Sequence, residues 1–320
     1  MSMVPPFTVS AQAISMIVEI TAQMERCTLN LEQLDSLKLR WVNRIRTICS
    51  SLAIEGNTLS ETQVSDIING KPVIAPRREI QEVKNAIRAY ELFPELDPFS
   101  VSDMLHAHGV MMESLNDDAG RFRHGGVGVF KGSETVHIAP PADRVPFLMN
   151  ELFDWLRTAS DHLLIRSCVF HYEFEFIHPF ADGNGRMGRF WQSLILSRLN
   201  PLFQHLPVES MVHDRQKEYY RAINESSAMN DSGPFIDFML RTISETLSGG
   251  VNGGVNGGVN ALYEFIFTHP GCRANQIAEA LRESLRTVQR RLAELKRLGM
   301  IEFRGAPRNG GYFRKSGRWK

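Results

Sequence analysis

The twelve residues His178–Arg189, with the sequence HPFADGNGRMGR, constrain this chain more than any other stretch. Gly183 and Gly185 permit backbone angles that other residues resist, so successive N–H groups can point inward as an anion-binding nest. The apolar spacing of Arg186–Leu199 predicts a helix directly after this turn. Because a helix N-terminus presents free N–H groups and a partial positive charge, the stretch predicts a phosphate-binding site.

The charged side chains of the same stretch add chemistry to this site. Arg186 and Arg189 lie three residues apart, so they share one face of the helix, and a guanidinium fork suits phosphate oxygens. The carboxylate of Asp182 can hold a hard cation such as Mg2+, which prefers oxygen ligands and bridges substrate phosphates. His178 is placed to take a proton from a hydroxyl. The pattern therefore favours nucleotide phosphate binding beside a general base, and the alternative is a glycine-rich helix entry with two solvated arginines.

The stretch also resembles the signature of the Fic family, HxFx(D/E)GNGRxxR. All fixed positions are filled, by His178, Phe180, Asp182, Gly183, Asn184, Gly185, Arg186 and Arg189. The resemblance implies a mainly α fold, a Fic-type helical bundle with a β-hairpin flap. It implies ATP bound by Gly183, Asn184, Gly185, Arg186 and Arg189, with Arg189 at the γ-phosphate and Mg2+ at Asp182. His178 would deprotonate a Ser, Thr or Tyr hydroxyl of a target protein, which would then receive AMP.

A second motif lies upstream, in Ser51–Asn57, with the sequence SLAIEGN. Gly56 is a common residue at a helix end, and Glu55 just before it is unfavourable there because the helix dipole prefers cations. The Fic family has an inhibitory helix with the motif (S/T)xxxE(G/N), which Ser51, Glu55 and Gly56 fit. The resemblance implies that Glu55 pairs with Arg189 and blocks productive binding of the γ-phosphate.

Residues 120–141 change character and predict a β-hairpin, because alternating valines flank a Gly132-Ser133 turn. The resemblance implies that this hairpin is the flap, which lies over the active site and clamps an extended segment of the target by main-chain pairing. The alternative is a purely structural hairpin. We expect Arg121 and Arg123, just before the hairpin, to make structural ion pairs.

Other histidines and tyrosines receive simpler predictions. His106 and His108 lie two residues apart on a predicted helix and point to different sides, so we expect packing or surface roles rather than metal binding. His171 is predicted to be buried rather than catalytic. Tyr219 and Tyr220 match a place where the Fic family contacts the nucleotide base.

The length of 320 residues suggests two domains and a small third. The tandem repeat GGVNGGVNGGVN has too little apolar mass for a core and too much glycine for a stable helix, which predicts a flexible linker. We therefore expect an N-terminal helical region with the inhibitory helix at 1–95, a catalytic core with the flap at 96–247, the linker at 248–260 and a winged-helix domain at 261–320.

The C-terminal part is basic although the whole chain has no net charge. Residues 259–320 hold 13 basic and 5 acidic residues, which leaves 23 basic and 31 acidic residues in 1–258. Three short helices followed by two strands resemble a winged helix-turn-helix. The second helix of the helix-turn-helix motif is the recognition-type helix, and it is the third of these three helices. This helix and the wing carry the residues that can meet phosphates and base edges, namely Thr287, Gln289, Arg290, Arg291, Arg304, Arg308, Arg314 and Lys315. DNA binding and protein contact both stay open for 261–320.

The four cysteines are scattered without a Cys-x-x-Cys pair, which fits a reducing cytoplasm, and no apolar stretch is long enough to span a bilayer. The sequence thus predicts a cytoplasmic, Fic-like protein adenylyltransferase that is autoinhibited by Glu55. Self-modification stays open. The alternatives are removal of AMP or transfer of another phosphate-containing group at the same site, and a nucleotide-sensing DNA-binding regulator.

Overall fold

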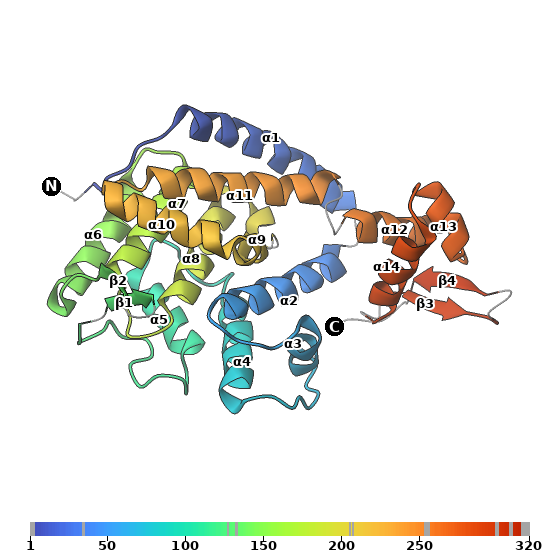
Figure 1. Cartoon of the computed structure of the whole chain (residues 1–320), viewed down its shortest axis with the longest axis horizontal. Coiled ribbons are helices and arrows are strands. Elements are labelled where there is room, and N and C mark those ends of the chain that lie inside the picture. The colour runs from blue at the N-terminus through green and yellow to red at the C-terminus, as the bar shows by residue number, and fades with distance from the viewer. Residues whose placement is uncertain are drawn as a thin grey trace.

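The structure is a computed structural model that describes residues 4–33, 36–126, 128–131, 134–204, 206, 208–252, 257–297, 301–306 and 310–314. It shows a helical body and a smaller C-terminal lobe (Figure 1). The helices of the body are α1 (Ala11–Gln33), α2 (Ser36–Ile54), α3 (Glu61–Ile68), α4 (Arg77–Glu91), α5 (Val101–Met111), α6 (Val145–Thr158), α7 (Leu163–Ile177), α8 (Asn184–Leu199), α9 (Val208–Asp214), α10 (Gln216–Met229) and α11 (Gly233–Asn252). Short 3-10 turns at Ala142–Arg144 and Pro201–Gln204 complete it. The predicted mainly helical fold is confirmed.

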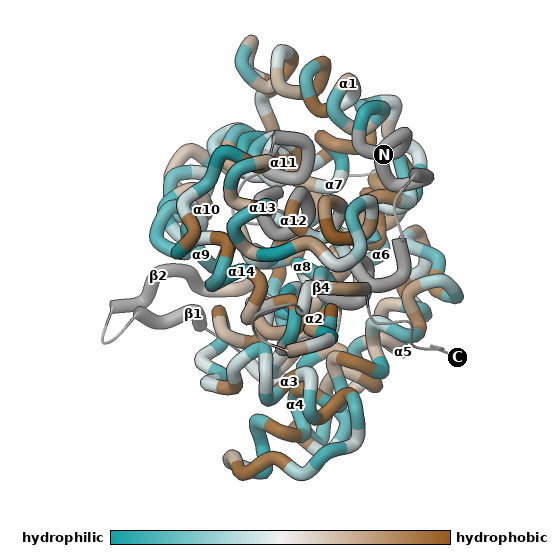
Figure 2. The backbone as a smooth tube through the Cα atoms, turned by 90° about the vertical axis from the view of Figure 1, so that its right-hand side faces the viewer, coloured by the Kyte–Doolittle hydropathy of each residue, from teal (hydrophilic) through white to brown (hydrophobic). Residues whose placement is uncertain are grey.

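Helix α7 lies at the centre of the body and is buried on every side, because apolar residues occupy all of its faces. It packs against α6, α8 and α11, and α1 runs along α11 at the outside (Figure 1). The outer helices α1 and α4 alternate hydrophobic and hydrophilic residues along their length, as expected for helices that bury one face (Figure 2). The end of α7 is therefore a rigid place to mount a reactive side chain.

One hydrophobic core joins the two parts that the sequence analysis separated at residue 95. It includes Ala13 and Ile20 from α1, Leu96 beside the boundary, and Ile243 and Leu247 from α11. The division of the body into 1–95 and 96–247 stays a prediction, and the packing does not mark it.

Helices α2, α3 and α4 build a second, smaller cluster beside the main core. Its members are Ile45, Ile48, Leu52, Leu59, Val64, Val83 and Ala86. Ser60 closes a capping box with Gln63 at the start of α3. This cluster holds the end of α2, and with it Glu55, in a fixed place.

The hairpin lies between α5 and α6, as predicted. Strand β1 (Gly128–Lys131) pairs antiparallel with β2 (Glu134–Ile138), and the register shifts between Val129 and Phe130. The expected turn Gly132-Ser133 lies outside the described residues.

The C-terminal lobe has its own core and the predicted order of elements. Helices α12 (Gly257–Thr268), α13 (Ala274–Ala280) and α14 (Leu285–Arg297) precede the antiparallel strands β3 (Ile301–Arg304) and β4 (Gly311–Arg314). Residues such as Leu262, Ile277 and Leu292 pack together there, separately from the body.

The glycine-rich segment differs from its prediction as a non-helical linker. Helix α11 continues to Asn252 and α12 begins at Gly257, so residues 248–252 and 257–260 are helical. Glycine costs about 1 kcal/mol relative to alanine in a helix. Propagation from a helix that tertiary packing already holds is cheap, so neighbouring structure overrides the low propensity. Within the described residues, no helix is long and apolar enough to cross a membrane.

Candidate active site

His178 stands at the C-terminal end of α7 in a left-handed backbone conformation. Its φ is 51° and its ψ is 62°, and its N–H donates to the carbonyl of Phe174 at 2.9 Å. A positive φ is uncommon outside glycine and persists only where the surroundings over-determine it. The imidazole is half-buried at the point where the chain leaves the helix. The chain therefore keeps a strained backbone at the residue that ends α7.

The loop after His178 is closed by its own side chains. Gly183 has a φ of 86°, which glycine adopts without a steric penalty, and its N–H donates to the Asp182 carboxylate at 2.7 Å. The side chain of Asn184 accepts from the Phe180 N–H at 2.9 Å and donates to the Phe180 carbonyl at 2.8 Å. The Asn184 side-chain amide thus closes the loop at the start of α8, and its role in ATP binding stays a prediction.

His108 supports this loop from α5, a role that the sequence analysis missed. Its ring stacks on Phe180 with centroids 3.6 Å apart. Its Nδ1 accepts from the Gly120 N–H at 2.9 Å, so its Nε2 carries the proton and donates to the Asp182 carbonyl at 3.0 Å. Burial lowers the pKa of His108 to about 4, which keeps the ring neutral near pH 7. Two histidines at spacing two gave no sign of this contact, because it depends on tertiary packing.

Arg189 and Glu55 meet across 134 residues of sequence. The Arg189 Nη2 donates to Glu55 Oε1 at 2.7 Å, and the same nitrogen donates to the Ser51 carbonyl at 3.0 Å. Arg189 is 3% exposed, whereas the Glu55 side chain is 38% exposed. Burial alone would lower the pKa of Arg189, but the Glu55 carboxylate turns the net shift upward. The structure thus brings together the two residues that the resemblance pairs.

Gly185 contributes space rather than an unusual backbone angle. It lies inside α8, and of the turn's two glycines only Gly183 has a positive φ, so the predicted nest of two glycines is wrong in this respect. A Cβ at position 185 would come within 2.4 Å of the Glu55 Oε1 and 3.0 Å of the Arg189 Nη1. Only glycine lets the ion pair lie so close to the helix.

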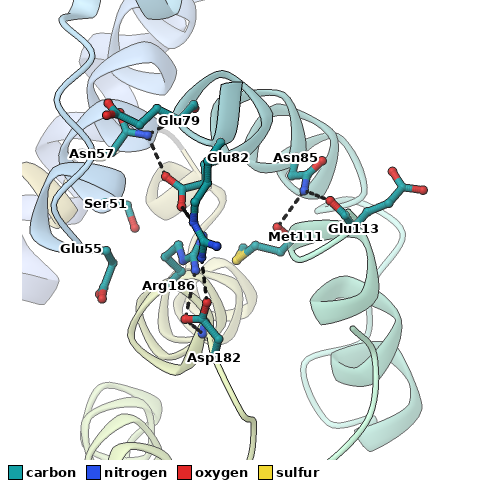
Figure 3. A network of polar contacts seen from close by, with 12 residues as sticks. Ser51, Glu55, Asn57, Glu79, Glu82, Asn85, Met111, Glu113, Asp182 and Arg186 are labelled. Atoms are coloured by element: carbon teal, nitrogen blue, oxygen red, sulfur yellow. Dashed lines mark hydrogen bonds and ion pairs between the residues drawn. The ribbon is translucent and has the colours of Figure 1, made fainter. Parts of the chain in front are cut away.

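A polar network links the loop to the start of α4 (Figure 3). The Asp182 carboxylate accepts from Arg78 Nη2 at 3.1 Å and lies 3.5 Å from Arg186 Nη2. Glu82 lies 3.4 Å from Arg78 and 3.9 Å from Arg186, and it accepts from the Asn57 amide at 2.9 Å. Arg78 and Glu82 escaped the sequence analysis because no motif marks them. Two guanidinium groups therefore face the one carboxylate that the sequence assigned to a metal.

The residues around Asp182 are compatible with Mg2+ only if a bound nucleotide and water supply most of its ligands. Among the described residues, no group of three or more His, Cys, Asp or Glu side chains gathers in a way that could hold a metal. Mg2+ is commonly bound by one or two carboxylates together with substrate phosphates and water. Asp182 fits that donor set if nucleotide phosphates and water supply the other ligands.

His171 is fully buried behind the site, as predicted. Its Nδ1 donates to the Gln192 side-chain oxygen at 2.6 Å, and its Nε2 accepts from the Tyr219 hydroxyl at 3.1 Å. Tyr219 is 2% exposed and committed to this contact, whereas Tyr220 is 44% exposed. Of the two tyrosines, Tyr220 is the accessible one.

The contribution of His171 to stability should fall on acidification, because His171 must stay neutral in the folded protein. Burial lowers its pKa to about 3, from a usual value near 6.5. Between these values the unfolded chain binds a proton that the folded chain refuses, so stability is lost as pH falls from 6.5 towards 3. The positive charge of Arg189 also lowers the pKa of His171. Glu175 Oε1 lies 3.8 Å from His171 Nε2, and burial raises the pKa of Glu175 to about 7, so the contribution of Glu175 to stability changes with pH in the opposite direction.

The histidine contribution can be isolated by comparison with a His171→Gln variant in urea unfolding experiments. Between pH 6.5 and about pH 5 the stability advantage of the parent should shrink by about 2 kcal/mol, at about 1.4 kcal/mol for each pKa unit. An advantage that stays constant over this range would contradict the assignment of a neutral, buried His171.

The comparisons with known proteins agree with this geometry. The sequence model of the Fic/DOC family matches residues 98–196. A crystal structure of a Fic family protein from Desulfovibrio desulfuricans G20 is 42% identical, covers 99% of this chain and 100% of its own, and superposes with a TM-score of 0.76. The chain therefore belongs to the Fic family.

Two curated relatives carry a more specific name. "Protein adenylyltransferase Fic" of Nematostella vectensis is 28% identical over 212 residues, which are 62% of this chain and 47% of that protein. "Protein adenylyltransferase fic-1" of Caenorhabditis elegans is 30% identical over 204 residues, which are 60% of this chain and 38% of that protein. The chain thus spans less than half the length of these relatives.

Proposed function

We propose that this protein is an adenylyltransferase that moves AMP from ATP to a hydroxyl side chain of a target protein. The observation that carries the proposal is the meeting of three features at one helix start. His178 follows the end of α7 in a left-handed backbone conformation, α8 with its N-terminal N–H groups begins six residues later, and Arg186 and Arg189 lie in the first turns of α8. A base and a phosphate cradle are what nucleotidyl transfer to a hydroxyl requires.

In the proposed reaction His178 takes the proton of the target hydroxyl. The hydroxyl oxygen then forms a bond to the α-phosphorus of ATP while the bond from that phosphorus to the bridging oxygen of the β-phosphate breaks. The products are AMP-protein and pyrophosphate, and His178 releases its proton to solvent. Arg186 and the start of α8 stabilise the phosphate charge, and Arg189 holds the γ-phosphate when Glu55 is displaced.

Mg2+, when bound, would be held by Asp182 and would neutralise charge on the nucleotide phosphates. Arg78 and Arg186 occupy the Asp182 carboxylate in this structure, so the metal and the nucleotide would rearrange these contacts. The contact between Glu55 and Arg189 supports the proposal that Glu55 inhibits the transfer until it is displaced. The cytoplasmic location stays a prediction from the sequence.

Isotope position tests the proposed reaction. Incubation with a cell lysate should place label on protein from α-labelled ATP and not from γ-labelled ATP. Label from the γ-position would indicate phosphoryl transfer, another reaction of the same site. Release of AMP from a modified target without any labelling would indicate the reverse activity, and either outcome would overturn the proposal.

We also propose that the C-terminal lobe binds DNA. The boundary of this lobe at residue 261 stays a prediction. The supporting observation is that α14 exposes Arg286, Gln289 and Arg290 on its surface. Two of the arginines predicted to contact DNA already have acidic partners, since Arg291 forms an ion pair with Glu283 and Arg304 forms one with Glu302. Arg308 and Lys315 lie outside the described residues.

Salt dependence tests this second function. Binding of duplex DNA to the full chain should weaken as salt is raised, because counterions are released from DNA phosphates. The variant Arg286→Gln/Arg290→Gln should bind more weakly and reduce the slope of log affinity against log salt by about 2, at roughly one per phosphate contact. The matched control Arg121→Gln in the body should keep the parent slope. An unchanged slope in the α14 variant, or affinity that salt does not affect, would favour protein contact instead.

A further inference from the structure

Arg123 lies at the root of the hairpin and is buried to 2% exposure without a carboxylate partner in the described part of the chain. The sequence analysis expected a structural ion pair here, and that prediction is wrong. Among the described residues, the acceptors of the guanidinium are main-chain carbonyls. These are His178 at 2.8 Å, Gly125 at 2.9 Å, Pro140 at 2.5 Å and Ile177 at 3.3 Å.

The four acceptors come from two parts of the molecule. Gly125 precedes β1 and Pro140 follows β2, so the guanidinium joins both legs of the hairpin. Ile177 and His178 end α7, where carbonyls lack partners within the helix and a cation is favoured by the helix dipole. One rigid, planar group thus holds the base of the hairpin against the end of α7.

The contact is made at His178, the residue proposed as the general base. His178 has a left-handed backbone, and its carbonyl is held by the Arg123 Nε. The next carbonyl, of Pro179, accepts the backbone N–H of Arg123 itself at 3.0 Å. The Ile177 and His178 carbonyls, which both accept from the Arg123 guanidinium, belong to the two peptide groups that flank the His178 Cα. Because both of these planar groups are held, the direction of the imidazole depends on Arg123.

We infer that Arg123 is a positioning residue that fixes the His178 side chain relative to the hairpin, and so relative to a target segment held there. This inference rests on the proposed adenylyl transfer. A buried arginine used only for stability would be expected to pair with a carboxylate. A fork that spans the hairpin and the general base aligns the hydroxyl with the imidazole, and a displacement of about 1 Å can cost on the order of 10²-fold in rate.

The test compares Arg123→Lys and Arg123→Gln with Arg121→Gln, the exposed neighbouring arginine, all in the full chain carrying Glu55→Gly. We expect Arg123→Gln to lower kcat for AMP transfer about 10–100-fold. The KM for ATP should stay within about threefold of the parent value, because no nucleotide contact is assigned to Arg123. Arg123→Lys keeps the charge but lacks the fork, so it should fall between. Circular dichroism identifies any variant that does not fold. If Arg123→Gln does not fold, Arg123→Lys is compared with Arg121→Gln instead.

Hydrogen exchange supplies a readout that does not need activity. Amides of residues 124–126 and of residues 177, 178 and 180 should exchange faster in both Arg123 variants than in Arg121→Gln, with the two segments changing together. A folded Arg123 variant with unchanged kcat would overturn the inference, as would a loss confined to KM or exchange that changes in one segment only. If the parent transfers no AMP, the proposed reaction fails, while the exchange result still decides whether Arg123 joins the hairpin to His178.

Discussion

His178→Ala should reduce AMP transfer by about 10²–10⁴-fold, the usual cost of removing a general base. The imidazole stands at the end of α7, beside the phosphate cradle and apart from the arginines that would hold the nucleotide. Alanine can adopt the backbone of this position only with strain, so the variant should also be somewhat less stable. Its nucleotide affinity should nevertheless stay close to that of the parent, because Arg186 and the start of α8 remain.

The measurement is transfer from α-labelled ATP, with isothermal titration of a non-hydrolysable ATP analogue as the control for binding. His106→Ala is the matched variant, since His106 is an exposed histidine on α5. We expect His106→Ala to retain the parent rate. Transfer at the parent rate by His178→Ala would remove His178 from the mechanism, whatever the fate of the other assignments.

The helical framework of the site could be predicted from sequence because its signals are local. The apolar run from Leu163 to Ile177 predicts a helix, and α7 has these bounds. Helix α8 begins at Asn184, two residues before the predicted start at Arg186. The sequence from Val208 to Ala228 predicts one helix, but the chain forms α9 and α10, which are divided at Arg215, where no proline or glycine marks the break. Local patterns therefore identified the elements, and tertiary packing decided their ends.

The contacts between distant segments divide into two kinds. Glu55 and Arg189 could be paired because each belongs to a motif of a known family, although 134 residues separate them. His108, Arg78 and Arg123 could not, because their partners are main-chain carbonyls or a network that forms only after folding. A carbonyl acceptor leaves no mark in a sequence, since every residue has one.

The sequence analysis gave the wrong reason for the glycine at position 185. The glycine was expected to supply an unusual backbone angle, yet it lies in a regular helix. Its hydrogen atom faces the Glu55 carboxylate, so the constraint is the volume of a Cβ. The same glycine would also leave room for a phosphate after Glu55 has moved, so the proposed inhibited arrangement and the proposed active arrangement both depend on this residue.

Glu55→Gly should raise AMP transfer, including self-modification, by about 10²-fold. Glu55 Oε1 occupies the Arg189 guanidinium at 2.7 Å, the place proposed for the γ-phosphate. An arginine–carboxylate contact and an arginine–phosphate contact use the same fork, so they exclude each other. The competition decides where the triphosphate lies, and a misplacement of about 1 Å at the α-phosphate can cost on the order of 10²-fold. Ser51 keeps Arg189 in place after Glu55 is removed, because its carbonyl accepts from the same guanidinium at 3.0 Å.

Two further variants separate charge from shape. Glu55→Gln keeps the side-chain volume and an acceptor oxygen but loses the charge, so it should give a smaller gain than Glu55→Gly. The double variant Glu55→Gly/Arg189→Ala should lose the gain, because the γ-phosphate site would be absent. Labelling of the same target by all four proteins, with folding checked by circular dichroism, decides the matter. If Glu55→Gly labels no faster than the parent on any target, including itself, the ion pair is a structural contact and not an inhibitory one. If the double variant keeps the gain, Glu55 acts without Arg189, and the γ-phosphate must be held elsewhere in the site.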